Sequence, residues 1–387
     1  MGIYLDASAT TPPAAAVLEE MAAVQASAWG NPSSLHGIGQ AAAEALERSR
    51  WRSAAVLGCE PDELIFTSGG TESIHLALLG TAALMPPGRL LISSVEHPAT
   101  EAAAAQLEQS GWSVLRLPVD PHGLVHPSAL EEALAPPTRL VSLIWGQSEV
   151  GSLQDLETLG QLCRRAGVPL HVDAVQVVGH CPVTFRALPV DLLSLAAHKL
   201  QGPRGIGALL VRRGHALHSQ LGGGGQEEGR RAGTEPVALA AGLACALELA
   251  AGRLLKTGDP LAQLRDQLWR QLQPLPGLAL TGPDPLVQAE RRLPHHLSLL
   301  VASRRGQPLP GRALVRALDR CGYAVSSGSA CSSAGSAASP VLLALGVEET
   351  AADSGLRISL GPWLNAEDLR GFPEALEQAR QGLESAP

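Results

Sequence analysis

The chain has 387 residues and a mass of 40.1 kDa, so we expect two domains, or one large α/β domain with an addition. Hydrophobic residues make up 45% of it, enough for a sizeable core, which excludes a wholly disordered chain. The net charge of −8 argues against a protein that binds nucleic acid by neutralising phosphates.

The elements predicted in chain order alternate between helices and strands. Two helices, over 14–28 and 38–57, precede the first strand. Short apolar runs then follow, each with a helical stretch after it, which indicates a mainly parallel sheet covered on both faces. These runs span 63–68, 89–94, 113–119, 139–145, 168–174, 191–197 and 207–213.

A change of composition near 252–260 predicts a domain boundary. The elements expected after it are a helix over 261–273, strands at 296–302, near 323–326 and at 356–360, and helices over 311–321 and 366–383. We therefore predict an α/β fold. Its large domain covers 14–255, and a small α+β domain combines 1–13 with 256–387.

Other sequence features argue against a membrane protein, a secreted protein and a zinc site. No apolar run reaches the roughly 18 residues of a membrane helix, and the N-terminus lacks the basic and apolar regions of a signal peptide. The six cysteines are scattered without a CxxC pair, so neither a disulfide framework nor a zinc site fits. We expect a soluble cytoplasmic protein with no membrane or nucleic-acid partner.

Lysine is almost absent, because only Lys199 and Lys256 stand among the 29 basic residues. Composition bias alone could leave two lysines by chance. The alternative is that one of them does what arginine cannot, since only a deprotonated lysine serves as an amine nucleophile. Lys199 is the better candidate, because it follows an apolar strand and precedes a glycine-rich turn.

Two further segments place polar groups at the ends of predicted strands. The SGGTES turn at 68–73 opens a helix, so its free N–H groups could bind a phosphate, although an ordinary turn capped by threonine is equally compatible. Asp173 ends another strand and needs a positive partner. That partner is a protonated ring nitrogen or, with His171 on the same strand face, a metal ion.

An amine, a carboxylate and a phosphate-binding turn are together what pyridoxal phosphate requires. His97 follows another strand and could stack on the cofactor ring, or could be an ordinary loop histidine. Cys331 lies in a segment of serine, glycine and alanine over 326–339, which predicts an accessible nucleophile or else an incidental cysteine.

The ordered motifs make the chain similar to the pyridoxal-phosphate-dependent cysteine desulfurases of the NifS/IscS kind, a branch of the class V aminotransferase family. The matching segments are YLDASATTP, GNPSSLH, IFTSGGTES, EHPA, HVDAVQ, HKLQGPRGIGAL, RAGT, RLPHHLS, SSGSAC and LRISLG, which cover almost the whole chain. The resemblance implies a fold-type I transferase with a large domain and a small domain.

The resemblance also implies a role for each matching residue, and no metal. Lys199 would hold pyridoxal phosphate as a Schiff base, and Cys331 would accept the sulfur as a persulfide. The other implied cofactor contacts are made by Asp173 (ring nitrogen), Gln176 and Ser148 (ring hydroxyl), His97 (ring face), Gly70, Thr71 and His198 (phosphate), and Thr234 (the phosphate in the other subunit of a homodimer). Arg357 and Asn31 would bind the substrate carboxylate.

The implied reaction converts L-cysteine to L-alanine and passes sulfur through Cys331 to an acceptor protein, such as an iron–sulfur scaffold or a thiolation relay. The chain departs from the family pattern at Ser148 and His75, which replace asparagines, and at Ala196, which replaces a serine; the changes at Ser148 and Ala196 bear on cofactor affinity. The alternatives are a selenocysteine lyase or another C–S lyase on the same cofactor, and a degenerate non-catalytic homologue.

Overall fold

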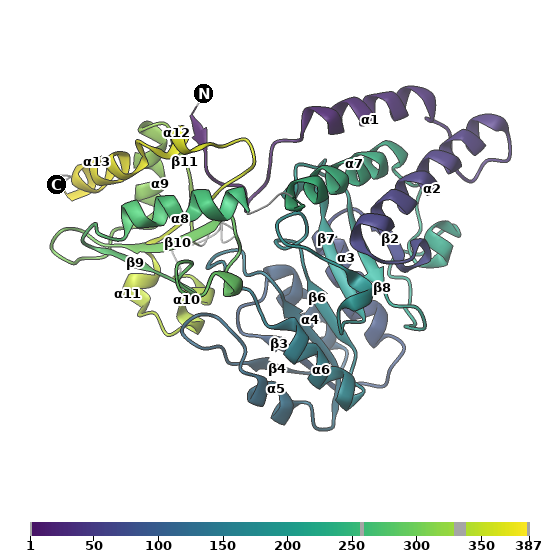
Figure 1. The fold of residues 1–387 in the computed structure, drawn as a ribbon. Coiled ribbons are helices and arrows are strands. Elements are labelled where there is room, and N and C mark those ends of the chain that lie inside the picture. The colour runs from purple at the N-terminus through teal and green to yellow at the C-terminus, as the bar shows by residue number, and fades with distance from the viewer. Residues whose placement is uncertain (1, 256–258, 329–337, 385–387) are drawn as a thin grey trace.

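The computed structural model describes residues 2–255, 259–328 and 338–384, which form two bodies joined side by side (Figure 1). The helices are α1 (Ala15–Ser27), α2 (Gly37–Leu57), α3 (Gly70–Ala82), α4 (Pro98–Gln109), α5 (Pro127–Ala133), α6 (Leu156–Ala166), α7 (Val237–Leu254), α8 (Pro260–Leu272), α9 (Gly311–Arg320), α10 (Pro340–Ala344), α11 (Glu349–Ala352), α12 (Ala366–Leu369) and α13 (Phe372–Glu384). The strands are β1 (Ile3–Tyr4), β2 (Leu64–Thr67), β3 (Arg89–Ser93), β4 (Ser113–Leu117), β5 (Thr138–Ile144), β6 (Leu170–Asp173), β7 (Leu192–Ala196), β8 (Gly207–Val211), β9 (Leu278–Leu280), β10 (His296–Val301), β11 (Tyr323–Ala324), β12 (Ser326–Ser327) and β13 (Gly355–Ser359).

The larger body is built on a seven-stranded sheet in the order β2-β8-β7-β6-β5-β3-β4. Every apolar run predicted as a strand before residue 213 lies in this sheet, and the strands from β7 to β4 are parallel. The expectation of a helix after every strand is wrong at two places. The crossover from β6 to β7 holds only a 3-10 helix over Phe185–Ala187, and β7 and β8 pair antiparallel. The chain between them holds only a 3-10 helix over Ala197–Lys199 and a turn, because a parallel crossover needs about a dozen residues or more.

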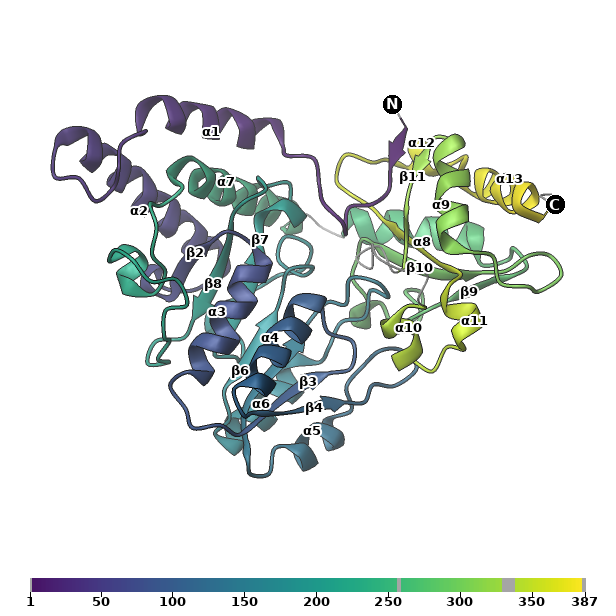
Figure 2. The same ribbon diagram turned by 180° about the vertical axis from the view of Figure 1, so that it is seen from behind.

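Helices cover both faces of this sheet, as predicted. Residues of α1, α2, α5, α6 and α7 share one buried core with one face, and α3 and α4 pack against the other. Figure 2 shows α3 and α4 in front of the strands, on the face turned away in Figure 1. The carboxyl ends of β5, β6 and β7 are thereby left open toward the smaller body.

Helix α7 corrects one sequence expectation. Its 18 residues are long and apolar enough to cross a membrane by length and composition, although no such run was expected. More than half of the helix is buried, and it packs against α1 and α2. Those contacts are the ones that an interior helix of a globular domain makes.

The smaller body has an antiparallel sheet in the order β12-β13-β10-β9, whose core includes residues of α8, α9 and α13. Strand β1 pairs with β11, so the chain begins in this body before it crosses to α1 (Figure 1). The single helix expected over 366–383 is two helices, α12 and α13, with Gly371 between them. A Cβ at Gly371 would come within 3.0 Å of the Tyr323 hydroxyl, so the backbone there approaches its neighbour closely.

Candidate active site

A cavity of about 310 Å³ lies where the carboxyl ends of β6 and β7 meet the N-terminus of α3. Ligands in open α/β sheets bind at this edge. Most of the predicted site residues line it: Gly70, Thr71, His97, Ser148, Asp173, Gln176, His198, Lys199 and Arg357. Segments far apart in the sequence therefore converge on one space.

Lys199 ends the 3-10 helix that follows β7, and its amine points at the N-terminal segment of the chain. Nζ donates hydrogen bonds to the carbonyl oxygens of Ser8 at 2.6 Å and Ala9 at 2.9 Å. The turn after it contains Gln201 at φ 67°, a left-handed conformation that costs energy in a residue other than glycine. Thr11 holds that turn, since its Oγ1 accepts the N–H of Gln201 at 2.7 Å.

Asp173 is the last residue of β6 and is 3% exposed. Burial raises the pKa of its carboxyl group, whereas the charge of His97, the N–H of Val175 and the charge of Lys199 lower it. Only Oδ1 has a hydrogen bond among the described residues, from the N–H of Val175 at 3.0 Å. A buried carboxylate in this setting is stabilised by a cationic partner in the cavity.

Gln176 lies one turn further along the same loop, and its amide is only half satisfied. Nε2 donates to the carbonyl oxygen of Ser8 at 2.9 Å. Oε1 is buried and has no hydrogen-bond partner among the described residues. An unpaired buried oxygen is costly, so the geometry fits a ligand with a hydroxyl or N–H group at this place.

The N-terminus of α3 forms a cradle for an anion. Gly69 adopts φ 153°, and a Cβ on Gly70 would come within 2.8 Å of a Val175 methyl group, so the backbone lies against the cavity wall. The first N–H groups of a helix have no partner within the helix, and they carry a positive partial charge. Thr71 lies in this first turn and also lines the cavity.

His198 stands beside this cradle as a neutral ring. Burial and the charges of Lys199 and Arg204 lower its pKa from 6.5 to about 4. Its Nδ1 is 3.2 Å from the Thr10 hydroxyl. A neutral imidazole with a second nitrogen available can donate one hydrogen bond to a bound phosphate.

His97 caps α4, where its Nδ1 accepts the N–H of Ala99 at 3.1 Å. Nδ1 is thereby engaged as an acceptor, and Nε2 is the ring nitrogen that can carry a proton. Ser148, in the turn after β5, also lines the cavity, and its hydroxyl is shorter than the asparagine that the resemblance leads one to expect. Ala196 lines it too, and it contributes no hydrogen bond where the family pattern has a serine.

Arg357 lies on β13 of the smaller body and reaches the same cavity. The residue is 4% exposed; Nη2 pairs with Asp6 at 2.8 Å and Nη1 donates to the Ser148 carbonyl oxygen at 3.1 Å. Nε is buried without a partner among the described residues. Two fixed acceptors thus aim the guanidinium at the open side of the site.

Three predicted residues are not brought to this cavity within the described chain. Asn31 is exposed, and its Oδ1 accepts the N–H of Ser33 at 2.9 Å. Thr234 is exposed in the loop before α7. Cys331 lies outside the described residues. The roles of Asn31, Thr234 and Cys331 stay predictions.

The alternative of a metal ion at Asp173 and His171 finds no support in the geometry. Both ring nitrogens of His171 face serine hydroxyls, Ser142 on β5 at 2.8 Å and Ser194 on β7 at 2.9 Å. Burial lowers the pKa of this histidine to about 3. Within residues 2–255, 259–328 and 338–384, no three histidine, cysteine or acidic side chains gather as metal ligands would.

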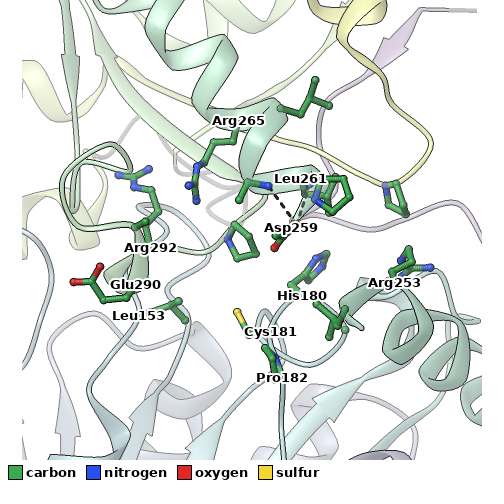
Figure 3. A pocket seen from close by; sticks show the side chains of 18 of the residues that line it. Leu153, His180, Cys181, Pro182, Arg253, Asp259, Leu261, Arg265, Glu290 and Arg292 are labelled. Atoms are coloured by element: carbon green, nitrogen blue, oxygen red, sulfur yellow. Dashed lines mark hydrogen bonds between the residues drawn. The ribbon is translucent and has the colours of Figure 1, made fainter. Parts of the chain in front are cut away.

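A larger cavity of about 720 Å³ lies between the two bodies (Figure 3). His180, Cys181 and Arg253 reach it from the large body, and Arg265 and Arg292 reach it from the small one. Both of these last guanidinium groups bind backbone carbonyls, and burial raises the pKa of the Cys181 thiol to about 12. Although it is the larger space, its Arg265 and Arg292 side chains are engaged in structural contacts.

Sequence reasoning gave no role to the N-terminal segment, although its YLDASATTP motif was noticed. In the structure, this segment crosses the site. Asp6 pairs with Arg357, and the carbonyl of Ser8 accepts hydrogen bonds from both Lys199 and Gln176. The signal that could have identified it is a polar run directly after a two-residue strand at the edge of the small body.

Comparisons with known proteins agree with this geometry. The aminotransferase class-V family profile matches residues 3–372. The chain is 38% identical over 384 residues to "Cysteine desulfurase IscS" of Dictyoglomus turgidum, covering 98% of this chain and 95% of the relative.

Solved structures give the same result. A "NIFS-LIKE PROTEIN" superposes with a TM-score of 0.89 at 32% identity, with full coverage of both chains. A structure described as "SspA in complex with cysteine" superposes with a TM-score of 0.81 at 30% identity, covering 94% of this chain and all of the other. With its fold, its cavity and nearly its whole length matched in this way, the chain belongs to the aminotransferase class-V family.

Proposed function

We propose that this chain is a pyridoxal-phosphate-dependent cysteine desulfurase, which converts L-cysteine to L-alanine and takes the sulfur onto Cys331. The observation that carries the proposal is the convergence of the Lys199 amine, the Asp173 carboxylate and the Arg357 guanidinium on one cavity. The names of the relatives at 36–40% identity agree with it.

The residues present fit the cofactor. Its phosphate matches the cradle at Gly70 and Thr71, its ring nitrogen matches the buried Asp173, and its ring hydroxyl matches the unpaired Gln176 oxygen. Bound pyridoxal phosphate supplies an electron sink that makes the α-proton of an amino acid removable. Lys199 would hold it as a Schiff base, and His97, which lines the same cavity, would stack on its ring.

Lys199 is also the base that this site offers for the α-proton. Its Nζ already lies in a hydrogen-bonded position between the carbonyls of Ser8 and Ala9. Those two acceptors fix the amine near the carboxyl ends of β6 and β7, and a proton taken up at Nζ stays stabilised by them. The neighbouring His198 ring stays neutral and does not compete for that proton.

Arg357 selects a substrate with a carboxylate. A planar guanidinium binds such a group through two parallel hydrogen bonds. Asp6 and the Ser148 carbonyl orient it before the substrate arrives, so little side-chain freedom is lost on binding. These contacts recognise the carboxylate of the amino-acid substrate and not its sulfur.

The sulfur transfer balances without another reactant. L-Cysteine and the Cys331 thiol give L-alanine and a Cys331 persulfide: the carbon–sulfur bond of the substrate breaks, a sulfur–sulfur bond forms, and the thiol proton is returned to the product. The persulfide then passes sulfur to an acceptor protein, for iron–sulfur cluster synthesis or for thiolation.

A homodimer follows from the same proposal. Thr234 is exposed and does not line the cavity of its own chain, as expected for a residue that completes the phosphate site of a second copy. Large apolar side chains are exposed around α1 and α2, where Leu35 is 93%, Trp29 64% and Trp51 63% exposed. A partner subunit would cover such a patch. A cytoplasmic location stays a prediction from the sequence.

The test is L-alanine formation from L-cysteine by the protein loaded with pyridoxal phosphate, compared with Cys331→Ser. The proposal predicts alanine from the wild type and its loss in the variant. Alanine from both proteins would favour another C–S lyase, and a higher rate with L-selenocysteine that survives Cys331→Ser would favour a selenocysteine lyase. A protein that takes up no cofactor would favour the degenerate homologue.

A further inference from the structure

Glu149 is a buried carboxyl group next to the candidate site that the proposed mechanism does not use. It lies in the turn after β5, and the Gln147 side chain fixes that turn. Gln147 Oε1 accepts the N–H groups of Glu149 at 2.5 Å and Val150 at 2.9 Å, and its Nε2 donates to the Val95 carbonyl at 3.2 Å. Glu149 is 6% exposed, and its Oε1 has no hydrogen-bond partner among the described residues.

The groups around this carboxyl come from the two ends of one segment. A Cβ added to Gly328 would overlap Oε1 of Glu149, so the glycine backbone lies directly against it. From the other end, the Ser339 side chain acts on the same carboxyl group, where it lowers the pKa of Glu149. Gly328 and Ser339 flank residues 329–337, the stretch that contains Cys331.

Both ends are joined to fixed elements of the fold. On the incoming side, β12 pairs with β13 and places Ser326 opposite Arg357, and the N–H of Gly328 donates to the Gly355 carbonyl at 3.3 Å. On the outgoing side, Ser339 caps α10 by accepting the N–H of Leu342 at 3.2 Å.

Helix α10 is in turn packed against the large body. Leu342 and Leu345 form a buried cluster with Val95, Ile144 and Val150. Val150 directly follows Glu149, so the apolar contact and the carboxyl contact hold the outgoing end at the same turn.

We propose that Glu149 is a positioning residue for the sulfur-transfer step: its carboxyl group holds the two ends of the Cys331 segment together at the Arg357 side of the cavity. The inference rests on the proposed function for its role in transfer, but the contact itself does not. Glu149 directly follows Ser148 of the cavity lining but does not line the cavity itself, and it acts through Gly328 and Ser339.

The electrostatics of the carboxyl agree with such a contact. Burial raises the pKa of Glu149, while the Ser339 hydrogen bond and the charge of Arg357 lower it. The carboxyl group is therefore costly to bury, and its neighbours are the cation of Arg357 and the hydroxyl of Ser339. A buried carboxyl group that needs hydrogen-bond partners fixes the positions of its neighbours more closely than an apolar contact would.

The first experiment compares Glu149→Ala and Glu149→Gln with the wild type, all loaded with pyridoxal phosphate. Iodoacetamide labelling of Cys331, followed by peptide mass spectrometry, reports how freely the segment moves. We expect labelling to be several-fold faster in Glu149→Ala and intermediate in Glu149→Gln. Cofactor absorbance and the KM for L-cysteine should stay within about twofold of wild type, while kcat falls roughly tenfold or more.

Glu63→Gln is the matched control, because Glu63 is also a buried carboxyl that accepts backbone N–H groups, but in the large body, at the end of the 3-10 helix Pro61–Glu63 before β2. It should change neither labelling nor kcat. A general loss of stability would affect both glutamate variants alike, whereas loss of the contact affects only the Glu149 variants.

Gly328→Ala supplies a double-mutant cycle. In the wild type the added methyl group collides with the Glu149 carboxyl, so kcat should fall and labelling should rise. In the Glu149→Ala background the same change should have little further effect, because the collision is gone. Unchanged labelling in Glu149→Ala, or additive effects in the cycle, would overturn the inference. If the wild type forms no alanine, the proposed function fails, and the labelling comparison still decides whether Glu149 holds the segment.

Discussion

Replacement of Arg357 by lysine tests the assignment of the substrate-carboxylate site. The guanidinium is buried, with Nη2 on Asp6 at 2.8 Å and Nη1 on the Ser148 carbonyl at 3.1 Å. Lysine keeps the positive charge but lacks the planar fork of donors. It cannot hold both acceptors and also present two parallel hydrogen bonds to a carboxylate.

The expected magnitude follows from the hydrogen bond that is lost. A hydrogen bond to a charged group contributes about 1.5–3 kcal/mol, and about 1.4 kcal/mol corresponds to a factor of ten. We therefore expect the KM for L-cysteine to rise by roughly 10- to 100-fold. Since the carboxylate is bound equally in the ground state and the transition state, kcat should change by less than about threefold.

The assay is the rate of L-alanine formation over a range of L-cysteine concentrations, with cofactor absorbance recorded for each protein. Arg370→Lys is the matched control, because the Arg370 side chain is 78% exposed and reaches only Glu367, at 3.9 Å. An unchanged KM in Arg357→Lys, or a fall in kcat at constant KM, would refute the assignment.

Three further predictions address the cofactor site and the core. Gly70→Ala puts a methyl group 2.8 Å from Val175, so cofactor affinity should fall by about tenfold or more in an absorbance titration; an equal affinity would contradict the cradle. Lys199→Arg keeps a cation between the two carbonyls but removes the amine. We expect the melting temperature to stay within a few degrees of wild type, with no covalent cofactor chromophore and no alanine formed. A residual covalent chromophore would count against the role of Lys199. Burial lowers the pKa of His171 from 6.5 to about 3, so the unfolded state gains a proton below pH 6.5 while the folded state does not, and stability is lost as the pH falls. At pH 5 this loss is about 2 kcal/mol. In urea unfolding, the decrease in stability from pH 7 to pH 5 should be smaller by that amount in His171→Gln than in the wild type. Equal decreases in the two proteins would show that folding does not lower the pKa of this ring.

The sequence pattern predicted most of the fold, because buried parallel strands are short apolar runs. Both their residue types and the turn residues that bound them identify such runs in a sequence. The strand order and the antiparallel position of β8 depend on how segments far apart in sequence pair, which periodicity does not encode. The three-residue strand β9 is too short to give a period. The break at Gly371 depends on the approach of Tyr323 from another element.

The candidate site was predictable where one residue type is chemically required. Lys199 and Asp173 stand at strand ends, where the fold itself predicts a binding edge. Asp6 and Glu149 were not predictable, because their roles arise from contacts with Arg357 and Gly328, which lie far from them in the sequence.

The most direct test of the account is the mass of the Cys331 peptide after one turnover with L-cysteine, with L-alanine measured in the same sample. The account predicts a gain of one sulfur atom on that peptide and one alanine for each persulfide formed. Alanine without added sulfur on Cys331, or added sulfur on a different cysteine, would contradict it.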